Sequence, residues 1–121
     1  MPFKAVYDDT YFNAMVPAAD SVQAVCERTD QMQFTGDIIA KIKQRIEHSD
    51  AVIVDLSESN PNVMYEAGFA HALNRPTIHV CSTVLKDLPF DVSTWPTISY
   101  EKGQTYKLKP LLTEKLRAIV P

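Results

Sequence analysis

One apolar run constrains the fold of this chain more than any other feature. Residues 51–56 read A-V-I-V-D-L, in which Asp55 is the only polar residue. A strand with one solvent face alternates apolar and polar residues, so this run is typical of a strand buried on both faces of a parallel sheet. Residues 77–81, which read T-I-H-V-C, are expected to form the next strand.

A helix is expected between these two strands, and both of its ends are marked. Asn60 precedes Pro61; asparagine is a favoured N-cap, and proline fits the first helical position. Residues 74–76 read N-R-P, and they should end the helix because proline disfavours helical geometry in the residue before it. Residues 51–81 therefore predict a right-handed βαβ unit.

The first helix is expected to follow Asp8 or Asp9. Phe12, Met15 and Ala19 recur in it at helical spacing and should face the core. Pro17 lies inside this helix and should kink or divide it. The remaining expected elements are helices at residues 35–48 and 105–120 and short strands at residues 24–28 and 97–100.

The first seven residues leave two interpretations open. Phe3, Ala5 and Tyr7 alternate with Lys4 and Val6, which favours a short strand. Alternatively, M-P-F is the loop that follows a first strand, and the chain lacks that strand. In the second case, neighbouring strands have unpaired backbone groups that another copy of the chain would pair.

Composition excludes several classes of protein. The 121 residues carry a net charge of −3, which argues against the basic stripe of a nucleic-acid interface. No apolar run approaches the ~20 residues that span a bilayer, and no signal peptide is recognisable, so we expect a cytoplasmic protein with no membrane partner. Cys26 and Cys81 are far apart and the histidines have no metal-spaced partners, so we expect neither a disulfide scaffold nor a metal site.

The candidate site lies at the carboxyl ends of the expected strands, where ligands of parallel sheets bind. Asp55 and Ser57 stand at that edge, and Asn60 follows in the same loop. Asn62 and Glu66 are four residues apart and share a helix face, on which Asn62 is the candidate ligand contact. For Asp55 and Asn60, turn acceptor and N-cap are the alternative roles.

Two more candidates come from the flanking loops. Asp30 follows Arg28 after the expected strand at residues 24–28, and a surface salt bridge is the alternative role for this pair. Phe90 lies in the L-P-F-D sequence and is a candidate for stacking on a planar ligand, with simple packing as its alternative.

The central stretch also carries a resemblance to a known family. It reads S-D-A-V-I-V-D-L-S, followed after two residues by N-P-N-V-M-Y-E-A-G-F-A-H-A-L-N-R-P-T-I. It resembles bacterial proteins related to nucleoside 2-deoxyribosyltransferases and to TIR-like nucleotide-binding domains. Weaker likenesses are M-P-F at the start, E-R-T-D at residues 27–30 and L-P-F-D at residues 88–91.

The resemblance implies roles for two carboxylates. In the transferases, a glutamate in this helix attacks the anomeric carbon of a nucleoside, and Glu66 occupies its place. An aspartate at the end of the preceding strand positions the sugar or protonates the base, and Asp55 matches it. Many transferases have G-T before the glutamate, where this chain has N-V-M-Y.

Together these observations predict one α/β domain over residues 1–121, a flavodoxin-like three-layer sandwich whose first strand is short or missing. We expect it to cleave or transfer the N-glycosidic bond of a nucleoside, nucleotide or NAD-like dinucleotide. The alternative is a non-catalytic nucleotide-binding signalling module of TIR-like type. We expect no cofactor, a small-molecule substrate as partner, and a homo-oligomer.

Overall fold

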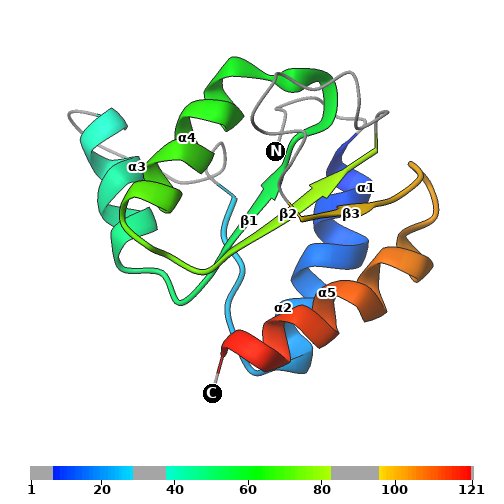
Figure 1. Ribbon diagram of the computed structural model, residues 1–121. Helices are drawn as coiled ribbons and strands as arrows, with labels where there is room; N and C mark the ends of the chain where they lie inside the picture. The colour runs from blue at the N-terminus through cyan, green and yellow to red at the C-terminus, as the bar shows by residue number, and fades with distance from the viewer. Residues whose placement is uncertain (1–6, 29–37, 83–95, 121) are drawn as a thin grey trace.

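The computed structural model describes residues 7–28, 38–82 and 96–120. Its sheet has three parallel strands in the order β1 (Val52–Asp55), β2 (Thr77–Cys81) and β3 (Thr97–Ser99) (Figure 1). Val52 lies opposite Thr77 in the register of the first pair, and His79 lies opposite Thr97 in the second. The predicted βαβ unit and the parallel sheet are confirmed.

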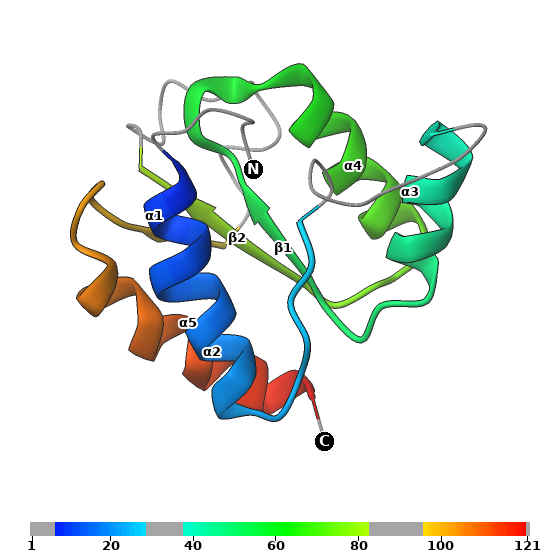
Figure 2. The ribbon, with the colours of Figure 1, turned by 180° about the vertical axis from the view of Figure 1, so that it is seen from behind.

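Helices cover both faces of this sheet, which confirms the three-layer α/β fold (Figures 1 and 2). α3 and α4 lie on one face, and the N-terminal helical stretch lies with α5 on the other. The helices are α1 (Asp8–Thr10), η2 (Tyr11–Met15), α2 (Val16–Ser21), α3 (Ile38–Glu47), η4 (Ser57–Ser59), α4 (Pro61–Ala72) and α5 (Thr105–Ile119).

The N-terminal helical stretch changes its winding just before Pro17. η2 is a π-helix, and α2 begins immediately after it. Proline lacks an amide hydrogen and clashes with the carbonyl four residues earlier, and such irregularities concentrate where a helix meets a proline. The helix is thus disturbed as expected, but Phe12 is 51% exposed, so its predicted place on the buried face is wrong. The wider winding turns Tyr11 and Ala14 inward instead.

The strand expected at residues 24–28 is not formed. These residues follow α2 and run beside β1 in both views, yet the described sheet contains no strand next to β1 on that side (Figures 1 and 2). Residues 1–6, where the first strand or its loop was expected, lie outside the described part of the chain.

Two clusters of buried side chains hold the layers together. The larger lies between the sheet and the layer of η2, α2 and α5, and it includes Met15, Val80 and Leu112. The smaller lies between the sheet and α4, and it includes Val54 and Val63. β1 and β2 are therefore covered on both faces, as their apolar sequences predict.

Candidate functional site

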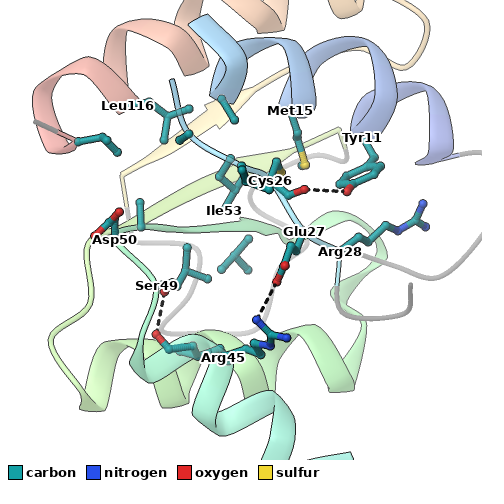
Figure 3. A pocket seen from close by; sticks show the side chains of 18 of the residues that line it. Tyr11, Met15, Cys26, Glu27, Arg28, Arg45, Ser49, Asp50, Ile53 and Leu116 are labelled. Carbon is teal, nitrogen blue, oxygen red and sulfur yellow. Dashed lines mark hydrogen bonds and ion pairs between the residues drawn. The ribbon is translucent and has the colours of Figure 1, made fainter. Parts of the chain in front are cut away.

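A cavity of about 530 Å³ extends along the edge of β1 that has no strand beside it (Figure 3). Residues 23–28 form one wall and residues 50–54 form the other. Side chains from both helical layers close the two faces of the space. These are Tyr11, Met15, Ala19, Leu116 and Val120 from one layer, and Arg45, Ile46, Val63 and Glu66 from the other.

Glu66 lines this cavity from α4. The helix starts after the carboxyl end of β1, because the Asn60 side chain caps it and Pro61 occupies its first position. Glu66 falls in the first half of the helix and is half-buried. A carboxylate in such a place can act on a molecule in the cavity while it keeps contact with solvent.

Cationic side chains also reach the cavity. Arg28 is 5% exposed, donates to the Asp8 carboxylate at 2.7 Å, and lies 5.6 Å from the centre of the Tyr11 ring. Arg45 lies on the α3 side, where its guanidinium is 3.6 Å from the Glu27 carboxylate. Each guanidinium therefore has a carboxylate partner, Asp8 for Arg28 and Glu27 for Arg45.

Asp55 lies in a different environment. Its side chain is fully buried at the carboxyl end of β1. One carboxylate oxygen accepts from the backbone N–H of Ser57 at 2.9 Å and from the Ser57 hydroxyl at 2.5 Å. The other accepts from the hydroxyl of Tyr100, and burial together with the charge of Asp55 raises the pKa of that tyrosine.

The hydrogen bonds continue from Ser57 to the end of β2. The Ser57 hydroxyl lies 2.8 Å from the Ser82 hydroxyl and accepts from the backbone N–H of Ser82 at 2.9 Å. Asp55, Ser57, Ser82 and Tyr100, which we term the strand-end network, therefore tie the carboxyl ends of all three strands together. In this network Asp55 is a turn acceptor, the alternative role that its position suggested.

The expectation that Asp55, Asn62 and Glu66 line one cleft is not met in the described part of the chain. Of the three, Glu66 lines the cavity, whereas Asp55 is enclosed by the strand-end network. Asn62 is exposed on the first turn of α4 and does not contribute to the cavity wall. The physical reason is that both Asp55 oxygens accept hydrogen bonds within the protein, which turns this carboxylate inward.

Asn60 serves the helix. Its side-chain oxygen accepts from the backbone N–H groups of Asn62 at 2.9 Å and Val63 at 3.4 Å, which confirms it as the N-cap of α4. Asp30 and Phe90, the two loop candidates, lie outside the described residues.

A histidine pair links α4 to the sheet. The Nε2 atoms of His71 and His79 lie 2.8 Å apart, so one ring donates to the other. Burial, followed by the neighbouring His71, lowers the pKa of His79 to about 4, and burial also lowers the pKa of His71. The sequence did not indicate this contact between His71 and His79.

Sequence reasoning missed several residues of this region. Tyr100 follows β3, and since parallel strands end at one edge, its place in the sequence was a usable signal for contact with Asp55. Tyr7 donates to the Glu58 carboxylate at 2.6 Å, and burial and Glu58 raise its pKa to about 12. Cys26 lines the cavity with a pKa raised to about 11 by burial. No local signal marked Tyr7 or Cys26.

Residues 7–28, 38–82 and 96–120 contain no group of three or more histidine, cysteine or acidic side chains arranged to hold a metal ion. In the same ranges, no helix has the length and apolar character needed to cross a bilayer. No protein-family model matches the chain, and no curated protein matches it.

Proposed function

We propose that this chain binds a nucleoside, a nucleotide or an NAD-like dinucleotide and cleaves or transfers its N-glycosidic bond, with Glu66 as nucleophile. One observation carries the proposal. Glu66 is half-buried and lines the cavity beside β1, from a helix that follows the carboxyl end of that strand. The cavity runs along residues 50–54, so Glu66 would meet a ligand beside the strand.

The chemistry needs a carboxylate next to the anomeric carbon. A Glu66 oxygen forms a bond to that carbon while the carbon–nitrogen bond breaks, and the bonding electrons leave with the base, which takes up a proton. Water or a second base then attacks the same carbon and releases the Glu66 carboxylate. Two displacements at one carbon retain its configuration.

The other residues of the cavity have supporting roles in this proposal. The guanidinium of Arg45, whose side chain is 58% exposed, suits the phosphate of a nucleotide. Asp55 acts through the strand-end network, which fixes the loop that leads to α4, and is thus a positioning residue rather than the acid that assists departure of the base.

A non-catalytic nucleotide-binding module is the second candidate, and one observation favours it. Retaining glycosidases use two carboxyl groups about 5–5.5 Å apart. The second carboxyl group expected for this role, Asp55, is fully buried and accepts hydrogen bonds from Ser57 and Tyr100. A pocket that binds a nucleotide without breaking it needs no second acid.

Incubation with deoxynucleosides, deoxynucleoside monophosphates and NAD, followed by chromatography for free base, tests the proposal. Base release that disappears in Glu66→Gln and persists in Glu27→Gln supports it, since both glutamates line the cavity. Nucleotide binding without base release in the unchanged protein supports the module. The homo-oligomer expected from the sequence stays a prediction. Light scattering, which measures the molar mass in solution, tests it.

A further inference from the structure

Two arginines line the cavity, and their environments differ. The Arg28 side chain is almost fully buried and donates to the Asp8 carboxylate at 2.7 Å, a distance typical of a charge-assisted hydrogen bond. The Arg45 side chain is 58% exposed, and its guanidinium lies 3.6 Å from the Glu27 carboxylate, which is too long for such a bond. Arg45 is therefore the arginine that can exchange its partner for a group of a bound molecule.

The ion pair of Glu27 and Arg45 joins two different walls of the cavity. Glu27 belongs to the wall at residues 23–28, Arg45 lies in the last turn of α3, and the two side chains point toward each other (Figure 3). Glu27 is also 47% exposed at its side chain. Ion pairs between exposed side chains contribute little, because they are screened and both side chains lose freedom. A ligand with a stronger anionic group can therefore displace Glu27 at low cost.

A phosphate group is a stronger partner for this guanidinium than the Glu27 carboxylate. It carries a charge of about −1.5 to −2 near neutral pH and three acceptor oxygens. The planar guanidinium donates to two of these oxygens at once. Arg45 and Glu66 line the same cavity from α3 and α4, which pack against each other, so one nucleotide can contact both side chains.

A neutral nucleoside has no group that can replace Glu27. We propose that the ligand of this cavity carries a phosphate group that takes the place of Glu27 at Arg45, so that the site binds nucleotides in preference to nucleosides. This inference rests on the proposed function for the class of ligand. It adds the pair of Glu27 and Arg45 as the residues that determine which members of that class bind.

Calorimetry with matched ligands tests the proposal. The protein carries Glu66→Gln, so that base release does not disturb the titration. The probes are the common deoxynucleosides and their 5′-monophosphates. At least one monophosphate should bind about tenfold or more tightly than its own nucleoside, because a phosphate gains charge-assisted hydrogen bonds from Arg45. Inorganic phosphate should compete only weakly, because it lacks the sugar and the base.

Variants of Arg45 identify the source of this preference. Arg45→Gln should weaken monophosphate binding about tenfold or more and change nucleoside binding by less than about twofold. Arg45→Lys keeps the charge without the planar group and should fall between the two. Arg117→Gln is the matched control, because Arg117 is an exposed arginine of α5 that does not line this cavity. It should change neither affinity.

Glu27→Gln tests the exchange itself. It removes the competing carboxylate, so monophosphates should bind about threefold or more tightly, whereas nucleosides should bind as before. In the Arg45→Gln background the same change should have no effect, because no guanidinium remains to compete for; simple repulsion by Glu27 would persist there. Glu47→Gln is the matched control, since Glu47 is exposed and does not line the cavity. Glu27 contacts no reacting atom in this scheme, so base release persists without it.

Four outcomes overturn the proposal. They are equal affinities for nucleosides and monophosphates, a preference that survives Arg45→Gln, competition by inorganic phosphate as strong as that of the nucleotide, and failure of every monophosphate to bind.

The proposed catalysis fails separately from this inference. If the phosphate preference depends on Arg45 but the unchanged protein releases no base, the binding proposal stands and the catalytic one fails. If nucleosides and monophosphates release base equally and Arg45→Gln changes neither rate, the catalytic proposal stands and this inference fails.

Discussion

The sequence predicts that Asp55 and Glu66 act together in one site, but the two carboxylates lie in different environments. Asp55 is fully buried and accepts hydrogen bonds from Ser57 and Tyr100. Glu66 is half-buried and lines a cavity. Position at a strand end therefore does not by itself make a carboxylate reactive, because the Asp55 oxygens accept hydrogen bonds that stabilise the fold.

The largest change in stability is expected from a substitution that breaks the strand-end network. Asp55→Ala should lower the free energy of unfolding by about 3 kcal/mol, because it leaves the Tyr100 hydroxyl and the Ser57 N–H buried without their acceptor. Urea denaturation at neutral pH measures this loss. Tyr100→Phe removes one donor and should cost less, about 1 kcal/mol. If an Asp55 variant kept its stability and lost base release, Asp55 would be a catalytic residue and not a positioning residue.

The second prediction concerns Glu66. Its substitution should leave the stability nearly unchanged and remove the activity, the reverse of the pattern expected for Asp55. Glu66→Gln should leave the free energy of unfolding within about 0.5 kcal/mol, because a half-buried side chain of the same shape is kept. Base release should fall at least about a hundredfold, since a neutral amide is a poor nucleophile. Chromatography measures base release, and urea denaturation of the same sample measures the free energy of unfolding. Full turnover in this variant contradicts the proposed nucleophile.

A third prediction uses pH to test the link between α4 and the sheet. The folded state lowers the pKa of His79 from 6.5 to about 4, and it also lowers that of His71. Between these values the unfolded chain binds more protons, so stability should fall as the pH drops from about 6.5 toward 4. The loss should be on the order of 1 kcal/mol or more.

Paired denaturation curves measure that effect. His79→Gln together with His71→Gln should flatten the dependence in this pH range, because neither side chain then titrates. The same slope in the double variant would assign the pH dependence to other groups.

The smallest change in stability is expected at Asn60, which lies between the strand-end network and the helix that carries Glu66. Asn60 caps α4, the helix that carries Glu66 away from the strand-end network. Asn60→Ala should cost about 1 kcal/mol of unfolding free energy, whereas Asn60→Ser keeps a capping oxygen and should cost less. Thermal unfolding followed by circular dichroism resolves the difference. Equal stability of the alanine and serine variants would show that the cap is not needed.

Much of the fold followed from local patterns. The apolar runs of β1 and β2 predict strands covered on both faces, and Asn60 with Pro61 predicts the start of α4, because these features depend on neighbouring residues. The same reasoning placed Glu66 on a helix face near the strand ends. The error at Phe12 was local, because the π-helical winding before Pro17 turns this side chain outward. The error at residues 24–28 depends on distant segments, because this stretch runs beside β1 without joining the described sheet.

The sequence by itself determined β1, β2 and α4 and the parallel order of the two strands, since periodicity and caps act within a few residues. Only the tertiary structure decided which carboxylate meets a cavity. Tyr100 reaches Asp55 across 45 positions of the chain, and residues 24–28 run beside β1 without joining the sheet. Such outcomes depend on which partners surround a buried polar group after packing, and no local pattern specifies them.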